Sequence, residues 1–231
     1  MKNKLHLIAL NIPFPPDYGG AIDIFYKIKS LHGLGLEIIL HCFKYNRSQN
    51  IELNKYCTEV FYYERKNRAI DFFSSLPFIV KTRNHPQLLE NILNNPAPIL
   101  FDGLHTCHYL NNAKLASLTK IVRTHNIEHE YYLALTKSTN SLFHRFFFNR
   151  EAKKLKNFEK VLEHANALAC ISPEDKSYFD NKYGNAFFIP AFHPYEKNVS
   201  LKGRGDYILF HGNLSVAENR KALDFILNEV L

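Results

Sequence analysis

The chain has 231 residues, of which 46% are hydrophobic and 22% are charged. This balance excludes a largely disordered protein, because there is enough apolar surface to offset the entropy lost on folding. Lys and Arg number 29 against 22 Asp and Glu, a net charge of +7, which admits phosphates, an anionic lipid surface or nucleic acid as partners. A solvated basic surface explains the charge equally well, and without a nucleic-acid-binding motif we expect no nucleic-acid partner.

Short apolar segments alternate with helical patterns along the chain. Strands are predicted at 4–10, 36–43, 58–63, 98–101, 119–124, 166–171 and 185–189. Helices are predicted at 20–33, 48–56, 68–75, 86–94, 104–117, 127–136, 140–164 and 173–182. Several strands are almost wholly apolar, which is typical of strands buried on both faces. The pattern predicts an α/β fold, a doubly wound and mostly parallel sheet with helices on both faces.

A change of composition divides the chain near its carboxyl end. Residues 193–206 are polar with Pro and Gly, which predicts a linker after a Rossmann-like domain over residues 1–192. The apolar residues 207–210 then predict a strand, followed by a helix from about 218. Because one strand and one helix cannot close a core, we expect residues 207–231 to be the start of a truncated second domain.

The four cysteines are Cys42, Cys57, Cys107 and Cys170, and no C-x-x-C pair occurs. Zinc knuckles are therefore not expected, and Cys42 and Cys170 fit reduced core residues of a cytoplasmic protein. No run of about 18 apolar residues predicts a transmembrane helix. The apolar run near the start contains His6 and leads into prolines, so it predicts a core strand rather than a signal peptide.

The first candidate site is the segment PFPPDYGGA at 13–21, between the first strand and the first helix. Ligands of open parallel sheets bind at the carboxyl ends of the strands. Gly19 and Gly20 let a ligand approach the backbone, and the N-terminus of the following helix favours an anion such as a diphosphate. A tight Pro/Gly turn is the equally simple structural alternative. The segment is not G-x-G-x-x-G, so a dinucleotide fingerprint is absent.

The second candidate site is RTHNIEHEYY at 123–132, again after a predicted strand. His125 would face the same crevice as Gly19 and Gly20, and an imidazole there can donate to a phosphate oxygen or a hydroxyl. The segment also spells the inverted zinc-peptidase motif H-x-x-E-H with Glu128 and His129. That motif needs both histidines on one helix face, whereas His125 adjoins a strand and Asn126 resembles a helix N-cap, so zinc hydrolysis is the weaker alternative.

Two further segments have both structural and functional interpretations. The helix at 140–164 places Phe143 and its aromatic neighbours beside many lysines, which suits either an anionic membrane surface or a core-packed helix with a solvated basic face. The residues Ile171 to Asp175 predict a strand end with Ser172 as helix N-cap, from where Ser172 would also open toward the crevice.

Taken together, segments spread over most of the chain resemble the amino-terminal domain of the retaining family 4 glycosyltransferases, which have the two-domain GT-B fold. No single segment is decisive, but their order and spacing make the resemblance fairly specific. The matching segments are 13–20, the LHGLGLEI run at 31–38, THNIE at 124–128, Glu159 with ALACIS at 167–172, and FHGNL at 210–214 with Asn219.

The resemblance implies transfer of a sugar from a nucleotide-diphospho-sugar to a glycan or lipid-linked acceptor, with retention and without a cofactor or metal. The resemblance implies that His125 is the catalytic residue and that Gly19 and Gly20 bind the donor diphosphate. It places Asp17, Tyr18, Asn126, Glu128 and Ser172 around the acceptor or crevice, and Gly212 and Asn213 in a nucleotide loop of the second domain.

One departure from the family is expected to matter. The family's Glu-x7-Glu donor motif and its basic phosphate clamp belong to the second domain, so we expect the chain alone to be inactive or nearly so. Glu151 and Glu159 have the motif's spacing, but chance produces such pairs and the surrounding helix is in the wrong domain. The alternative is a non-catalytic domain that needs a separate donor-binding chain or that brings its partner to the inner face of a membrane.

Overall fold

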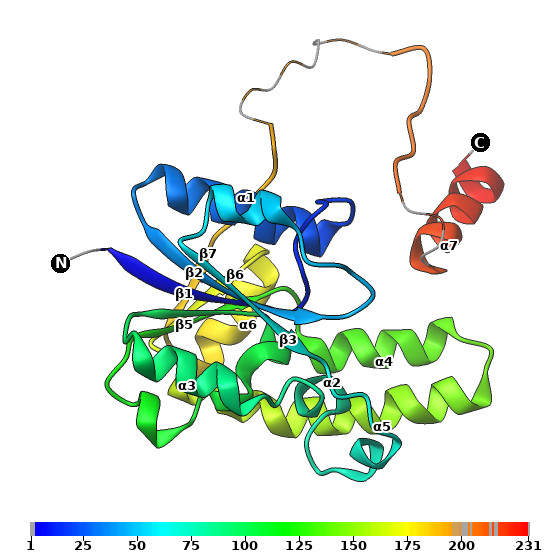
Figure 1. The fold of residues 1–231 in the computed structure, drawn as a ribbon. Coiled ribbons are helices and arrows are strands. Elements are labelled where there is room, and N and C mark those ends of the chain that lie inside the picture. The colour runs from blue at the N-terminus through cyan, green and yellow to red at the C-terminus, as the bar shows by residue number, and fades with distance from the viewer. Residues whose placement is uncertain are drawn as a thin grey trace.

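The computed structural model describes residues 3–195, 197, 199, 203, 205–212, 214 and 217–230. Seven parallel strands form one sheet in the order β3-β2-β1-β4-β5-β6-β7 (Figure 1). The strands are β1 (Lys4–Ala9), β2 (Glu37–Lys44), β3 (Glu59–Glu64), β4 (Ile99–Asp102), β5 (Lys120–Thr124), β6 (Ala167–Cys170) and β7 (Ala186–Phe188). All seven were predicted from the sequence within one or two residues, and the doubly wound α/β fold is confirmed.

The helical segments also follow the predicted order. The α-helices are α1 (Gly19–Gly33), α2 (Phe78–Lys81), α3 (Pro86–Asn94), α4 (Glu128–Ser138), α5 (Leu142–Phe158), α6 (Pro173–Tyr183) and α7 (Ala217–Phe225). The 3-10 helices are η1 (Ile51–Lys55), η2 (Ala69–Phe73), η3 (Leu104–Tyr109), η4 (Ala113–Leu115) and η5 (Glu159–His164), and η6 (Ile226–Val230) is a π-helix. The four-residue α2 was missed, because so short a segment carries no helical period.

Helices cover both faces of the sheet, and each face has its own apolar core. One core packs α1 and η1 against alternate residues of β1 and β2, with Leu7 and Leu40 fully buried at its centre. The other core packs α3, η3, α5 and α6 against the opposite face, where Ile8 and Phe101 are fully buried. Figure 1 shows α1 above the sheet and α3 below it. Because successive strand residues point to opposite faces, neighbours such as Leu7 and Ile8 enter different cores.

The strand order fixes where a ligand can enter. The chain builds outward from β1 through β2 to β3, then returns to place β4 on the other side of β1. The loops that leave the carboxyl ends of β1 and β4 therefore run in opposite directions, and they open a crevice at this switch point. Both candidate segments of the sequence, 13–21 after β1 and 123–132 within and after β5, reach this same edge of the sheet.

The predicted helix at 104–117 divides into η3 and η4, and two more local predictions were wrong. Residues 207–210 form no strand, and Tyr207, Ile208 and Leu209 are largely exposed, because no described strand lies beside them to pair with their backbone. The N-cap of α4 is Ile127 rather than Asn126, and it makes no side-chain capping bond.

Other features of the described residues bear on the sequence predictions. All four cysteines are buried and free, as expected for core thiols. No helix in the described part of the chain combines the length and the apolar character needed to cross a membrane.

Candidate functional site

A buried carboxylate lies at the centre of the carboxyl edge. Asp102 is the last residue of β4 and is fully buried. Lys27 of α1 donates to its Oδ1 at 2.5 Å, and Nε2 of His125 lies 3.2 Å from its Oδ2. A carboxylate shared in this way holds the imidazole with Nε2–H toward Asp102 and leaves Nδ1 as the nitrogen for a ligand. The His125 side chain is 16% exposed, so it is neither sealed in the core nor freely solvated.

The ion network continues beneath α1. Asp23 accepts from Lys27 at 2.9 Å and from Arg123 of β5 at 3.0 Å, and all three side chains are almost fully buried. Burial opposes the ionisation of Asp102, but Lys27 and then His125 outweigh it and hold the pKa of Asp102 well below its usual range. Burial likewise opposes ionisation of Asp23, and Lys27 leads the charges that lower its pKa. The network is thus a set of fixed charges in a dry site, the arrangement that stabilises charge developing in a reaction.

Gly103 allows His125 to approach the strand end. Its φ of +91° is a backbone conformation that side chains disfavour. A Cβ added at Gly103 would lie 3.5 Å from Cδ2 of His125 and 3.8 Å from Cδ2 of Leu10. The imidazole, the loop after β1 and the loop after β4 therefore meet at this glycine.

The glycine pair opens α1 at the same edge of the sheet. Gly19 is the first residue of α1, whose N-cap, Tyr18, makes no side-chain capping bond and whose first turn contains no acidic residue. A Cβ at Gly19 would meet nothing within 4 Å, whereas one at Gly20 would lie 3.1 Å from the Tyr18 ring. Backbone N–H groups at such an uncapped end can bind an anion.

The remaining predicted crevice residues have partners of their own. Asp17 pairs with Arg47 at 2.7 Å. Glu128 is buried and lies 3.0 Å from Nε2 of His105, which outweighs the effect of burial and lowers the pKa of Glu128. Asn126 is exposed beside it. Ser172 caps α6 by accepting from the Asp175 N–H at 3.0 Å, as its sequence context predicted.

The inverted zinc motif does not assemble. His125 turns to Asp102 and Glu128 turns to His105, while Nδ1 of His129 lies 3.1 Å from Glu159 on the opposite side of α4. Three motif residues with three separate partners cannot share one zinc ion, because a zinc site needs its ligand atoms around a common point. Zinc hydrolysis by this motif is therefore wrong.

One group among the described residues has metal-ligating atoms close together, namely Asp23, Asp102 and His125, within 4.8 Å of one another. The ammonium of Lys27 lies between the two carboxylates, and the guanidinium of Arg123 holds Asp23. Two resident cations already neutralise these carboxylates, so the donor set does not suit a further divalent cation.

Glu151 and Glu159 serve the fold rather than a donor motif. The Glu151 carboxylate accepts from the Phe78 N–H at the start of α2 and from Lys154. Glu159 is buried among His129, Tyr178 and Lys182, and each of them contacts its carboxylate. That Glu151 and Glu159 have the same spacing as the two glutamates of the family's motif is therefore a coincidence.

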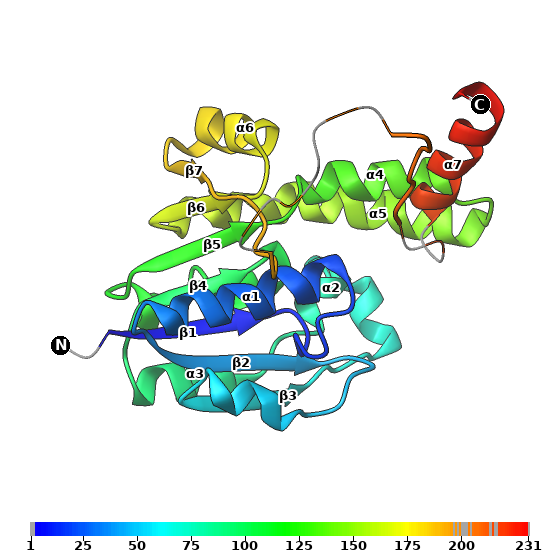
Figure 2. The same cartoon turned by 90° about the horizontal axis from the view of Figure 1, so that it is seen from above.

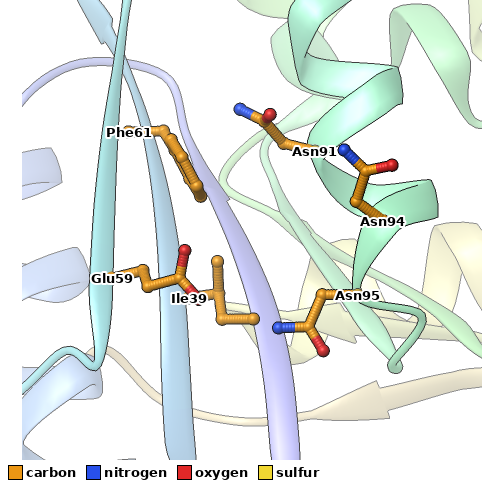
Figure 3. A pocket seen from close by; sticks show the side chains of 6 residues that line it. All are labelled: Ile39, Glu59, Phe61, Asn91, Asn94 and Asn95. Atoms are coloured by element: carbon orange, nitrogen blue, oxygen red, sulfur yellow. The ribbon is translucent and has the colours of Figure 1, made fainter.

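The predicted nucleotide loop and a cavity beside β3 are not part of the crevice. Gly212 lies near Asn219, and Asn213 is outside the described residues, so the predicted nucleotide loop stays a prediction. A cavity of about 320 Å³ opens between β3 and α3, with Glu59 and Asn95 at its mouth (Figure 3). Glu59 begins β3 and Asn95 follows α3 in the connection that leads into β4, so this cavity lies away from the carboxyl edge.

Sequence reasoning identified His125 but missed the charges that hold it. Asp102, Lys27, Asp23 and Arg123 were not singled out. A signal was present for Asp102, since a carboxylate that ends the apolar run ILF of a predicted strand stands where ligands bind. Lys27 and Asp23 look like ordinary helix charges in sequence, because only the packing of α1 on the sheet buries them.

No protein-family model matches the chain. It is 26% identical over 236 residues to an uncharacterised 44.6 kDa protein in the cps region of Klebsiella pneumoniae, and the match covers 98% of this chain and 60% of that protein. The chain therefore spans less than two thirds of the length of this relative.

Among solved structures, sucrose-phosphate synthase from Thermosynechococcus elongatus matches 81% of this chain and 47% of its own, with a TM-score of 0.56 and 16% identity. A UDP-glucosyltransferase from Polygonum tinctorium matches 85% of this chain and 53% of its own, with 11% identity and a TM-score of 0.47, too low to argue from. At these identities the likeness shows the fold alone. The chain therefore has a Rossmann-like α/β fold similar to part of the sucrose-phosphate synthase structure.

Proposed function

We propose that this chain is the acceptor-side part of a retaining glycosyltransferase. It would help to transfer a sugar from a nucleotide-diphospho-sugar to a glycan or lipid-linked acceptor in polysaccharide biosynthesis, in the cytoplasm. The observation that carries the proposal is the imidazole of His125, held by the Asp102–Lys27 pair at the switch point of the sheet. The cps-region relative supports the polysaccharide context.

The residues of the crevice have distinct proposed roles. The departing diphosphate accumulates negative charge as the sugar leaves, and donors that are already oriented stabilise it best. Nδ1 of His125, an acceptor while Nε2–H points to Asp102, faces a hydroxyl of the transferred sugar, with Asp102 keeping the ring in place. The N–H groups of Gly19 and Gly20 at the start of α1 bind the diphosphate. The nucleotide itself is held by a second domain, of which residues 207–231 are the proposed beginning.

The test is a transfer assay on a longer protein that continues past residue 231. With a panel of nucleotide-sugars and cell-derived acceptors, His125→Ala should lower kcat by about 10²- to 10³-fold, as the loss of one oriented polar group at the reacting sugar commonly does. His144→Ala removes an exposed histidine of α5 and serves as the matched control. Full turnover by residues 1–231 alone, or an unchanged kcat in His125→Ala, would contradict the proposal.

One observation favours the alternative of a recruiting domain. Leu142, Phe143 and Phe146 at the start of α5 are 77%, 70% and 60% exposed, beside Phe73 of η2 at 73%. Exposed aromatics among lysines suit the surface of an anionic bilayer. Co-sedimentation with vesicles containing anionic lipid, compared with neutral vesicles, tests this, and a Phe143→Ser, Phe146→Ser double variant should lose the binding.

A further inference from the structure

Three arginines gather at the carboxyl ends of β1, β2 and β3. Arg47 lies in the loop after β2, Arg65 directly follows β3, and Arg83 follows α2. The Arg47 guanidinium lies 5.2 Å from the centroid of the Tyr18 ring, and that of Arg65 lies 4.5 Å from the Tyr45 ring. Because these strands are parallel and adjacent, all of these side chains share the edge where ligands bind.

Arg65 and Arg83 are neighbours. Nε of Arg65 donates to Oγ1 of Thr82, the residue before Arg83, at 2.8 Å. Arg83 is 2% exposed, and its three guanidinium nitrogens donate to the Leu10 carbonyl, at 3.1 and 2.9 Å, and to the Ile79 carbonyl at 2.7 Å. Burial lowers the pKa of Arg83 to about 9, and the charge of Arg65 acts in the same direction. The two guanidinium groups therefore repel each other in a partly dry site.

These positive charges are not balanced. Within the described part of the chain, Asp17 is the carboxylate that pairs with Arg47, and neither Arg65 nor Arg83 pairs with one. Nη1 of Arg47 is buried and has no hydrogen-bond partner. Buried cations without counter-charges are costly to a fold, and a bound anion removes that cost. The unused donor of Arg47 and the unbalanced charges of Arg65 and Arg83 together describe an anion site.

This site is separate from the one at His125. Leu10 stands between them, because its carbonyl holds Arg83 while its side chain lies beside Gly103, against which the His125 ring packs. In the sheet, β3 and β5 are four strand spacings apart, which is about 19 Å. The backbones at His125 and Arg65 are therefore well apart, so a diphosphate at His125 leaves Arg65 for another part of the bound substrates, while Arg47, stacked on the Tyr18 ring that precedes Gly19, borders both sites.

We propose that Arg65 and Arg47 bind a phosphoryl group of the acceptor, with the buried charge of Arg83 behind them, so that the acceptor is a sugar phosphate or a lipid-linked phosphate. A phosphate monoester carries about 1.5 to 2 negative charges at pH 7, which matches the unbalanced charge. The planar fork of a guanidinium fits its oxygens in pairs. The acceptor assignment rests on the proposed transferase function, whereas phosphoryl binding at the arginines is tested without turnover.

The binding test uses the 231-residue chain with inorganic phosphate, glucose 1-phosphate and dihexanoyl phosphatidic acid, by calorimetry at low salt. One of the two organic phosphates should bind more tightly than inorganic phosphate, and which one does so identifies a sugar phosphate or a lipid as the source. If both bind no better than inorganic phosphate, the arginines hold an adventitious ion only and the proposal is overturned.

Variants locate the site. Arg65→Gln should weaken binding of the tighter-binding organic phosphate by at least about tenfold, because charged hydrogen bonds are lost. Arg145→Gln, which replaces an exposed arginine of α5, should change the affinity for the same phosphate by less than about twofold. Arg65→Lys keeps the positive charge but lacks the planar guanidinium, so it should bind the phosphate with intermediate affinity. This variant replaces Arg65→Gln in the test if Arg65→Gln does not fold.

His125→Ala separates this inference from the proposed function. It should leave binding at the arginines within about twofold while lowering transfer in the longer protein by about 10²- to 10³-fold. If His125→Ala weakens phosphate binding and Arg65→Gln does not, the anion site is at His125, so the acceptor inference fails and the transferase proposal stands. If the phosphates bind as expected but the longer protein transfers no sugar, the proposed function fails instead.

Discussion

Asp102 is the residue on which the crevice depends, because it joins a lysine of α1 to the candidate catalytic imidazole. Its carboxylate is fully buried and accepts from Lys27 while it orients His125. A buried carboxylate with two such partners keeps its charge, whereas removal of one partner from a buried ion pair leaves the other uncompensated. The stability of the domain and the position of His125 are thus linked through one side chain.

Asp102→Asn should lower the free energy of unfolding at pH 7 by about 3 kcal/mol, because Lys27 loses half of its counter-charge in a dry site. The pKa of Asp102 is lowered in the folded state. Its contribution is therefore complete above the unfolded pKa of about 3.9 and is lost as pH falls through and below that value. Urea unfolding at pH 7 and pH 3.5 should show the variant's deficit shrinking in acid.

The control for this prediction is Glu64→Gln, which breaks a pair between Lys44 and a Glu64 side chain that is 72% exposed. An exposed pair contributes about 0–1 kcal/mol. A loss in Asp102→Asn no larger than in this control would show that the network does not stabilise the fold.

The sequence predicted where site residues lie on the sheet better than it predicted which side chains they contact. His125 and Gly19 could be placed at the ligand-binding edge because each follows a recognisable strand. Lys27, Asp23 and Arg123 could not, because their roles arise from contacts across 75 to 100 residues of sequence. Such contacts leave no local pattern, since a buried lysine on α1 has the same helical spacing as an exposed one.

At the scale of elements, a chain of side-chain hydrogen bonds joins the first three strands. The Asn95 carbonyl can only accept, so Nε2 of His6 donates to it at 2.7 Å and Nδ1 of His6 accepts from Nε2 of His41 at 2.9 Å. Nδ1 of His41 in turn accepts from the Tyr63 hydroxyl at 2.7 Å, and that oxygen accepts from Asn91. In this direction of bonding both histidines are neutral.

The domain should therefore lose stability in mild acid. Burial lowers the pKa of His6 and, more strongly, that of His41, whose neighbour His6 adds to the effect. Below the unfolded pKa of about 6.5 the unfolded chain takes up protons first, so the free energy of unfolding falls by up to about 1.4 kcal/mol per pH unit for each histidine. Denaturant unfolding between pH 7.5 and 5 measures this slope.

His41→Gln should flatten the slope, whereas His144→Gln, which removes an exposed histidine of α5, should leave it unchanged. An equal slope in wild type and His41→Gln would contradict a neutral histidine pair in the core.

The elements themselves could be predicted because their patterns are long and regular. The strands are continuous apolar runs, and α3 has its predicted bounds of 86–94 with Pro86 at its start. The predicted helix at 104–117 instead divides into η3 and η4. Tertiary packing overrode local propensity there, since Leu104, Cys107, Leu110 and Leu115 all enter one core while the backbone at Cys107 is not helical.

At the scale of the whole molecule, Arg123 ties the end of the sheet to its beginning. From β5 it donates to the carbonyls of Ile189 and Pro190, which follow the edge strand β7. Asp23 of α1 accepts from Arg123 and from the Phe192 N–H at 2.9 Å. Figure 2 shows the chain after β7 turning back beside α1. The segment that leads to residues 193–206 is thus held against the same helix that carries the candidate diphosphate site.

Arg123→Lys should loosen this segment and weaken the fold together, because an ammonium cannot reach two carbonyls and Asp23 at once. We expect a loss of about 3 kcal/mol, which corresponds to a fall in Tm of about 6–12 °C for a domain of this size. Hydrogen exchange at the Phe192 amide should rise by a larger factor than exchange at the fully buried Leu7 in β1. Unaltered protection of the Phe192 amide in a destabilised variant would show that Arg123 supports the core alone, and that the segment after β7 is held by other contacts.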